Sequence, residues 1–441
     1  GLTLNEAESQ DNTATITGDL TVDAGSHAIN LVARVTSDGT DAEIDPNRKQ
    51  AYSHTITKAS GGAPTLFNAR RYVGNESARD INGFGFQPDL VWCKNRDQSD
   101  AHNMTDSVRG VTKVIYPNSS YYEDTETQFL TSFNADGYSV GNSHGVNGPN
   151  EGIVAWGFKA GGAPSGILAG LNETASLTNG VGNGTLNDGA TGCSAVTNIT
   201  QSVNQNSGFS ITKYEGTGSG TATFPHNLGG NPDWIIIKRL TGSDQRPWVV
   251  WHSGQTNATS TGTAVPNLYL DQNVASQTNN NGSSGWGTIQ PPSSTLITVN
   301  AGSSNNSSVA SDDVTYICYA WKAVSGVSAF GTYSGASAPT TVYTTSDGTS
   351  TGSGGFSPRF VIVKRTDGSG DWWMYDKFRG VTGSDANQHT ETKSIKANLS
   401  DAEASPNGWH IQFLTNGFKF PDYNRIGVNN NGESYIYMAL A

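Results

Sequence analysis

The stretch GFQPDLVWCKNR, residues 85–96, has the pattern of a turn followed by a strand, and two close copies of it follow in the chain. They are GGNPDWIIIKRL at 229–240 and GFSPRFVIVKRT at 355–366. Each copy has a proline, an apolar run and a lysine six residues after the proline. Proline fits just before a strand, where its missing N–H interrupts no ladder. Because the run is apolar on both faces, we expect a strand that is covered on each side or that also packs at a domain junction.

The segments around this strand also recur. Each copy begins with Tyr-x-Gly, at Tyr72, Tyr214 and Tyr333. Each copy closes on an aromatic strand: GIVAWGFKA at 152–160, TYICYAWKA at 315–323 and SYIYMALA at 434–441. Alternation in the last two places Tyr316, Cys318 and Ala320 on one face, and Tyr435, Tyr437 and Ala439 on one face. The pattern is typical of strands.

Two short turns predict hairpins. They are FNADGYSVG at 133–141 and LTNGFKF at 414–420, where Asp-Gly and Asn-Gly separate apolar runs. A unit of about eight short strands in about 100 residues suits a two-sheet antiparallel sandwich or jelly roll. Gly, Ser, Thr and Asn dominate the chain, which argues against long helices.

We therefore predict an all-β chain of three tandem antiparallel β-sandwich domains. Their expected ranges are 64–163, 164–327 and 328–441, and residues 161–206 are expected to form a loop or an extended edge strand. Residues 1–63 do not match the repeat, and their alternation predicts a partial Ig-like β segment. The second and third domains join directly, so we expect them to pack rigidly together.

Composition and charge exclude several classes. The formal net charge is −12 and no Lys/Arg run stands out, which argues against a nucleic-acid partner. No apolar run reaches the length of a membrane helix, and no signal peptide is visible. The chain starts at Gly1, so we expect a fragment or a processed product. Cys93, Cys193 and Cys318 lack metal-ligand spacing, and we expect Cys93 and Cys318 to be buried and unpaired.

Motifs for chemistry are weak, and we predict no enzyme, no catalytic residue and no cofactor. A G-x-S-x-G string at 348–352 lies in a Gly/Ser-rich loop without the strand and helix of a nucleophile elbow. The glycines of GTGSG at 216–220 lack a βαβ context and predict a hairpin loop. The histidines show no HxH or HExxH spacing, so no metal site is predicted from them.

Acidic residues leave two questions open. Asp38, Asp41, Glu43 and Asp45 could offer oxygen ligands to a structural calcium ion, although a solvated acidic turn is the simpler interpretation. A glycoside hydrolase needs two carboxyl groups about 5–9.5 Å apart in space, and the sequence singles out no such pair.

Four tryptophans are candidate contact residues. Trp248 and Trp251, and likewise Trp372 and Trp373, occupy comparable strand positions. Adjacent residues of a strand point to opposite faces, so in each pair we expect one ring in a core and the other exposed. The exposed ring would stack on a sugar or be buried against a neighbouring domain or subunit.

Several motifs occur together in residues 64–441: NPDWIIIKR, WVVWH, TYICYAWKA, FSPRFVIVKRTD, DWWMYDKFRG and SYIYMALA, and in the first copy FQPDLVWCKNR and NEGIVAWGFKAGG. With these motifs the chain resembles the repeated domain of tail-associated and fibre-like virion proteins of tailed bacteriophages, including those of marine and cyanobacterial hosts. The third copy departs from it, with Arg359 where the others have aspartate, and without a final W/F-K-A. The resemblance implies a virion protein with a concanavalin-like β-sandwich, and it supplies no catalytic residues.

The expected function is therefore non-enzymatic attachment of a phage tail fibre or similar appendage to a host surface glycan or protein. Repeating the sandwich would lengthen a protein that projects from the particle, and we expect a homo-oligomer, most simply a trimer, bound to other virion proteins. The alternative is a head or tail decoration protein without a receptor. A glycan-degrading tailspike is a third possibility, which would require a groove with two acidic residues.

Overall fold

The computed structural model describes most of residues 66–441 and, before them, four short strands. The described ranges are 66–168, 177–186, 192–218, 220–255, 265–279, 287–301, 307–345, 355–379, 381–382, 389–391, 393–404, 410–422, 424–425 and 427–441. The chain divides into two compact units, Gly1–Pro64 and Thr65–Ala441.

The first unit is described only in two short antiparallel pairs. These are β1 (Leu4–Asn5) with β2 (Thr15–Ile16), and β3 (His27–Ile29) with β4 (His54–Ile56). The rest of the expected Ig-like segment lies outside the described residues, so that expectation stays a prediction.

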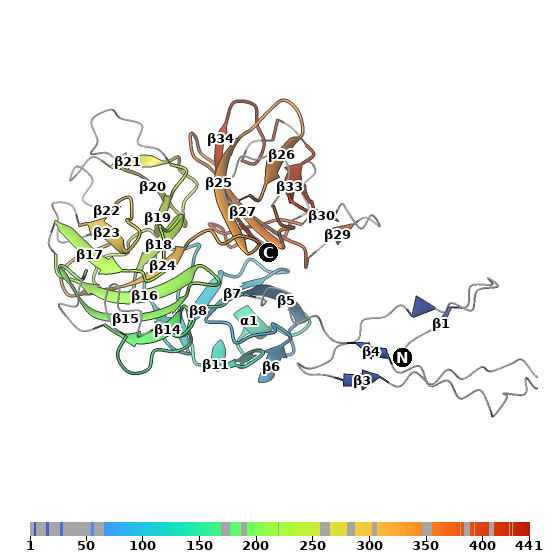
Figure 1. Cartoon of the computed structure of the whole chain (residues 1–441), viewed down its shortest axis with the longest axis horizontal. Coiled ribbons are helices and arrows are strands. Elements are labelled where there is room, and N and C mark those ends of the chain that lie inside the picture. Colours follow the sequence, from blue (N-terminus) through green and yellow to red (C-terminus); the bar gives the residue numbers. More distant parts are fainter. Residues whose placement is uncertain are drawn as a thin grey trace, which may run out of the picture. The chain divides into compact units, whose positions relative to one another are not determined.

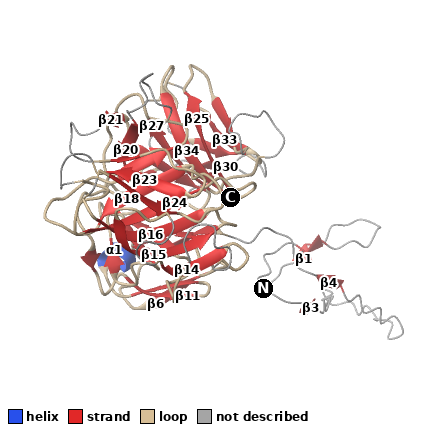
Figure 2. Ribbon diagram, turned by 60° about the vertical axis from the view of Figure 1, so that its left-hand side comes forward, coloured by secondary structure: helices blue, strands red, loops and turns tan. Residues whose placement is uncertain are grey.

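The second unit consists almost entirely of β-strands, which confirms the all-β prediction (Figure 2). Its described residues contain one helix, α1 (His144–Asn147), of a single turn. No helix among the described residues is long and apolar enough to cross a membrane.

The first repeat, within 64–163, has two antiparallel layers. In each repeat we call the sheet that contains the repeated strand the inner sheet, and the other layer the outer sheet. The inner sheet has the order β5 (Phe67–Val73), β13 (Gly152–Phe158), β7 (Leu90–Asn95), β8 (Asn103–Asp106). The outer sheet has the order β11 (Leu130–Asn134), β12 (Gly137–Val140), β6 (Arg79–Asn82), and a separate ribbon pairs β10 (Asp124–Thr125) with β9 (Lys113–Val114). Side chains from both layers form one apolar core, including Ile81, Val91, Cys93 and Tyr138.

The second repeat, within 164–327, has a wider inner sheet. Its order is β14 (Val181–Thr185), β15 (Val196–Asn204), β16 (Phe209–Gly216), β24 (Val314–Trp321), β18 (Trp234–Arg239), β19 (Val249–His252), β20 (Val265–Tyr269), β21 (Gln277–Asn279). The outer sheet has the order β17 (Thr221–Pro225), β23 (Leu296–Asn300), β22 (Thr288–Ile289). Part of 161–206 thus forms the edge strand β14, as expected, and β15 pairs beside it.

The third repeat, within 328–441, has two five-stranded layers. The inner sheet has the order β25 (Ser328–Ser334), β34 (Ser434–Leu440), β27 (Phe360–Arg365), β28 (Trp372–Asp376), β31 (Ile395–Lys396). The outer sheet has the order β26 (Thr340–Tyr343), β33 (Gly417–Phe420), β32 (Ile411–Phe413), β30 (His389–Glu391), β29 (Val381–Thr382). Both predicted hairpins are present, as the pairs β11–β12 and β32–β33.

The Tyr-x-Gly motif closes each sandwich at one edge. The hydroxyls of Tyr72, Tyr214 and Tyr333 donate to the carbonyl oxygens of Val146 (2.7 Å), Val309 (2.6 Å) and Val428 (2.6 Å) in a later loop of the same repeat, which in the first repeat contains α1. The glycine allows that loop to approach: a Cβ at Gly74 would overlap the carbonyl oxygen of Gly148. The motif recurs because each repeat ties down the same loop.

The inner sheets are apolar on both faces, and their second faces meet in one shared core. On β7, Val91 and Cys93 belong to the core of their own sandwich, whereas Leu90 and Trp92 belong to the shared core. The same alternation holds on β18 and β27, where the shared core includes Trp234, Ile236, Phe360 and Ile362. The two-sided strand predicted from the opening motif is therefore confirmed, and the junction that covers its second face involves all three repeats.

Aromatic rings join every pair of repeats (Figure 1 shows the strands of the three repeats in blue to teal, green to orange, and orange to red). The ring centroids are 5.4 Å apart for Phe67 and Phe360, 6.0 Å for Phe158 and Trp321, and 5.8 Å for Trp234 and Trp372. The three repeats thus pack around a common centre. The expectation that repetition lengthens the protein is wrong for this unit, because a two-sided apolar sheet is buried best by other sheets of its kind.

We predict that the second unit unfolds in a single cooperative transition, and that Phe360→Ala destabilises all three repeats together. Phe360 is 1% exposed and contacts two rings of the first repeat, so its truncation should lower the free energy of unfolding by about 3–5 kcal/mol. Differential scanning calorimetry on the full chain measures this effect. The control Val73→Ala, at a side chain that is 60% exposed, should change stability by less than about 0.5 kcal/mol. Separate transitions for the repeats would contradict a shared core.

Candidate functional site: the junctions between the repeats

The three junctions between the repeats share one kind of backbone hydrogen bond. Leu240, Thr366 and Arg96 each lie two residues after the repeated lysine of their strand. Their carbonyl oxygens accept the N–H of a residue in another repeat: Glu123 to Leu240 (3.1 Å), Ser276 to Thr366 (2.8 Å) and Glu403 to Arg96 (2.7 Å). The first repeat therefore bonds to the second, the second to the third, and the third to the first. The ring is closed, and its three junctions are quasi-equivalent.

An indole or imidazole side chain adds a second hydrogen bond at each junction. The first residues of β7, β18 and β27 pair with Asp106, His252 and Asp376 in the next strand of the sheet. Four residues before these partners stand His102, Trp248 and Trp372, which are therefore equivalent positions. The Nε1–H of Trp248 donates to Ser119 O (2.9 Å), and that of Trp372 donates to Tyr269 O (2.9 Å). His102 Nε2 lies 3.1 Å from Lys396 O. In each case the carbonyl belongs to the neighbouring repeat.

The four candidate tryptophans are all buried, and of the two alternatives for the outward ring of each pair, burial against a neighbouring domain is confirmed. Trp248 and Trp372 are 0% exposed and belong to the shared core, where they contact a neighbouring repeat. Trp251 and Trp373 are 7% exposed and belong to the cores of the second and third sandwiches. The opposite orientation of adjacent rings was also predicted correctly. Stacking of an exposed ring on a sugar is wrong for these four residues.

The lysine next to the end of each repeated strand is buried, and two of the three lysines bond across a junction. Lys238 Nζ donates to Ser120 O of the first repeat (2.8 Å), and Lys364 Nζ donates to Val274 O of the second (2.9 Å). Lys94 donates within its own repeat, to Gln98 O (2.9 Å) and Asn95 O (2.5 Å). Burial lowers the pKa of Lys94 to about 8 and that of Lys364 to about 7, and it also lowers the pKa of Lys238.

Buried Asp–Arg pairs link the first and third repeats to their neighbours. The motifs TDSVRG and YDKFRG place Asp106 with Arg109 (2.5 Å) and Asp376 with Arg379 (2.6 Å). Each aspartate also accepts a bond from another repeat: Tyr319 Oη–H donates to Asp106 (2.7 Å), and Trp156 Nε1–H donates to Asp376 (2.9 Å). Each carboxylate thus holds an arginine of its own repeat and a side chain of another repeat.

We predict that Asp376→Asn lowers the free energy of unfolding by about 3 kcal/mol. The substitution removes an anionic partner from Arg379, whose side chain is 0% exposed and also pairs with Glu403 (3.1 Å), and it weakens the bond from Trp156. Urea unfolding followed by tryptophan fluorescence measures the loss. The matched control is Asp244→Asn, at a side chain that is 51% exposed, where a change below about 1 kcal/mol is expected. Equal effects at the two positions would contradict a role for Asp376 at the junction.

Three buried histidines share one hydrogen-bonding pattern. Nδ1 accepts an N–H from Trp92 Nε1 in His102 (2.9 Å), from Gly254 in His252 (2.8 Å) and from Leu228 in His226 (3.1 Å). Nε2 of each ring faces a backbone carbonyl, which for His252 is Tyr437 O of the third repeat (3.2 Å). An accepting Nδ1 and a donating Nε2 describe the neutral imidazole. Burial lowers the pKa of His102 to about 3, and those of His226 and His252 to about 4.

We predict that stability falls as the pH drops from 6.5 toward 4. The unfolded rings bind a proton near pH 6.5, and the folded rings do so only near pH 3–4, so within this window the unfolded chain holds more protons. Each ring should then account for about 2 kcal/mol of lost stability at pH 5. Melting temperatures at pH 7.5, 6 and 5 measure the decline. Imidazole ¹⁵N shifts at pH 5 should remain those of the neutral ring, and titration of these rings near pH 6.5 would contradict the structure.

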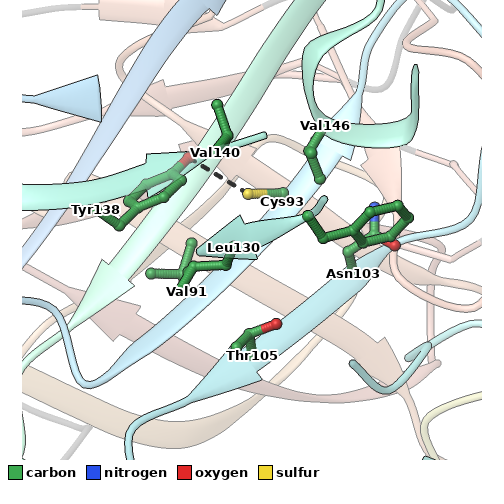
Figure 3. A pocket seen from close by; sticks show the side chains of 9 residues that line it. Val91, Cys93, Asn103, Thr105, Leu130, Tyr138, Val140 and Val146 are labelled. Atoms are coloured by element: carbon green, nitrogen blue, oxygen red, sulfur yellow. Dashed lines mark hydrogen bonds between the residues drawn. The ribbon is translucent and has the colours of Figure 1, made fainter. Parts of the chain in front are cut away.

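The buried thiols are not poised for nucleophilic chemistry. Figure 3 shows a pocket inside the first sandwich, where the hydroxyl of Tyr138 lies 3.4 Å from Cys93 Sγ among Val91, Val140 and Val146. Burial raises the pKa of the Cys93 thiol to about 12, and burial also raises that of Cys318. A nucleophilic cysteine reacts as the thiolate, which these surroundings disfavour. Both residues are buried, as expected.

One group of metal-ligating side chains lies beside α1. Asp100, His144 and Glu151 bring one ligand atom each within 4.8 Å of one another. The amide of Asn95 donates to Asp100 (2.7 Å) and to Glu151 (2.6 Å), which already satisfies one oxygen of each carboxylate. Calcium takes six to eight oxygen ligands and structural zinc takes four ligands, so the group is short of both.

Two other expectations lie outside the described residues. They are the acidic turn with Asp38, Asp41, Glu43 and Asp45, and the G-x-S-x-G string at 348–352. The buried lysines and the quasi-equivalent bonds were not predicted as contacts. The signal that could have identified them is the recurrence of the lysine six residues after each proline.

Comparison with known proteins gives a family and no function. The model of a family described as "Domain of unknown function (DUF7483)" matches residues 63–180 and 183–441. No curated protein and no solved structure matches the chain.

Proposed function

The chain belongs to the DUF7483 family, and we propose that it is a non-enzymatic module of a tailed-bacteriophage virion that attaches the particle to its host's surface through glycans. The closed ring of three sandwiches is the observation that carries the proposal. Backbone hydrogen bonds, indole N–H groups and buried lysines at the junctions hold the three sandwiches in fixed relative positions. A rigid scaffold suits a protein that works by contact.

The polar groups at the junctions support a structural role over catalysis. Their carboxylates bind arginine, their lysines donate to carbonyl oxygens, and their imidazoles are neutral and bonded at both nitrogens. A catalytic acid or base must instead reach a substrate. In the part of the chain that the structure describes, one pocket lies in the first sandwich and one in the shared core, and both are small and almost wholly apolar.

The threefold arrangement bears on assembly. A homotrimer of fibre chains would place three sandwiches around one axis, and here one chain does so by itself. The expected trimer of chains stays a prediction. Other virion proteins stay the proposed partners in the particle, and a host surface glycan or protein stays the proposed target.

A second function, decoration of the head or tail without a receptor, is favoured by the burial of the four tryptophans. These rings were the sequence's candidates for stacking on a sugar, and all of them are used inside the chain. Under this function the ring is a building block, and its outer loops contact only other virion proteins.

We predict that the purified chain competes with virions for host cells. Preincubation of cells with the chain should reduce virion adsorption in a saturable way, because both would occupy the same surface sites. Gold-labelled antibody against the chain on intact virions should mark the distal tail. Heat-unfolded chain is the control and should not compete. Label over the head together with no competition would contradict attachment and support decoration, and unlabelled virions would contradict the virion proposal.

A further inference from the structure

Four cationic side chains gather at the junction of the first and third repeats. Arg70 and Arg71 lie on β5, Arg359 directly precedes β27, and Lys377 follows β28. The guanidinium of Arg71 donates to Arg379 O across the junction (3.3 Å), and the N–H of Lys377 donates to Arg359 O (2.9 Å). We call Arg70, Arg71, Arg359 and Lys377 the basic patch.

Within the basic patch, Arg359 is close enough to Arg70 and Lys377 to repel both, and among the described residues none of the four cations has an ion-pair partner. Burial and then repulsion by Arg359 lower the pKa of Lys377 to about 8. Burial likewise lowers the pKa of Arg70, with attraction from Asp136 opposing it and Arg359 adding to it. Among the residues that the structure describes, no carboxylate oxygen lies within 4.0 Å of any of these four cationic groups. Like charges that form no ion pair leave a positive potential at the surface, which Asp136 offsets only in part.

The other two junctions do not carry this charge. Strand register gives the equivalent positions. At the junction of the first and second repeats they are Thr212, Lys213, Asp89 and Ser107, and at that of the second and third they are Gly331, Thr332, Asp233 and Ser253. At these positions the junction of the first and third repeats has four positive charges. The junction of the first and second repeats has one positive and one negative charge, and that of the second and third has one negative charge. The backbone geometry of the junction therefore does not require the basic patch.

We propose that the basic patch binds the anionic groups, phosphate or carboxylate, of a host surface glycan. The inference rests on the proposed attachment function and names its ligand chemistry. Arginine presents a planar fork of donors that matches both anions, and a cation without a counterion gains most from binding one. The net charge of −12 over the whole chain disfavours a long nucleic acid, which would extend beyond the patch into a negative field.

The test measures binding of the full chain to immobilised phosphomannan, polygalacturonate and neutral dextran at 50 and 300 mM salt. The variant is Arg359→Asp with Lys377→Ser, which installs the residues found at equivalent positions of the first two repeats. The control is Lys213→Thr, which installs the residue at the equivalent position of the third repeat. Circular dichroism and a thermal melt verify that each variant folds.

The wild type and Lys213→Thr should bind one or both anionic glycans and not dextran, with weaker binding at 300 mM salt. The double variant should bind at least about tenfold more weakly. The difference between phosphomannan and polygalacturonate identifies which anion the patch takes. Equal binding by the double variant and the wild type, or no binding by the wild type, would overturn the inference. A duplex DNA probe that binds as well as the glycans and is lost in the same variant would overturn the glycan assignment.

Competition with virions separates this inference from the proposed function. A folded double variant that loses glycan binding and also competes poorly supports both. A double variant that competes as well as the wild type overturns the patch as the host contact and leaves attachment standing. Glycan binding that depends on the patch, in a wild-type chain that does not compete, contradicts attachment and leaves the anion site in place.

Discussion

Everything in the second unit depends on an inner sheet that is apolar on both faces. A sandwich needs one apolar face per sheet, and the other face normally meets water. Here β7, β18 and β27 place alternate residues in two different cores, so a repeat by itself would expose a large apolar surface. Three such faces cover one another around a common centre. The polar bonds at the junctions follow from this, since groups buried there must find partners in the same chain.

The sequence was sufficient for the local structure, because local structure is encoded by periodicity and turn chemistry. Asp-Gly and Asn-Gly marked two hairpins, and the alternation in TYICYAWKA placed Tyr316 and Cys318 in one core. The two-sided strand was also predicted, together with the junction it requires. How the repeats would meet was not, because the loops at 116–123, 269–276 and 396–403 share little more than a short polar residue at their third position: Asn118, Asp271 and Asn398. The oxygen of that side chain accepts the backbone N–H of His102, Trp248 or Trp372 within its own repeat, and most of the bonds to the neighbouring repeat use backbone groups of the loop.

The tryptophans and lysines show where sequence reasoning about a site fails. Trp372 and Trp373 were correctly placed on opposite faces, but the sequence left open whether the second face meets a sugar or another domain, and it meets the second repeat. A lysine near a strand end normally reaches water, and Lys238 and Lys364 instead reach carbonyl oxygens of a neighbouring repeat. Both gaps have the same cause. Exposure is a property of the assembled ring, and no single repeat contains the information.

Covalent linkage of the three repeats also changes how the amino-acid sequences of the three junctions can diverge. In a ring of identical chains every substitution enters three times, so a residue harmful at one junction is harmful at all. In a single chain each junction has its own residues, and equivalent positions now hold different residue types. Position 102 is a histidine where the other two repeats have Trp248 and Trp372, and His252 is found where the other repeats have Asp106 and Asp376. The repeats are also held at a high effective concentration, so the ring closes without dependence on dilution. Such a scaffold can specialise one side of itself while the other two continue to hold it together.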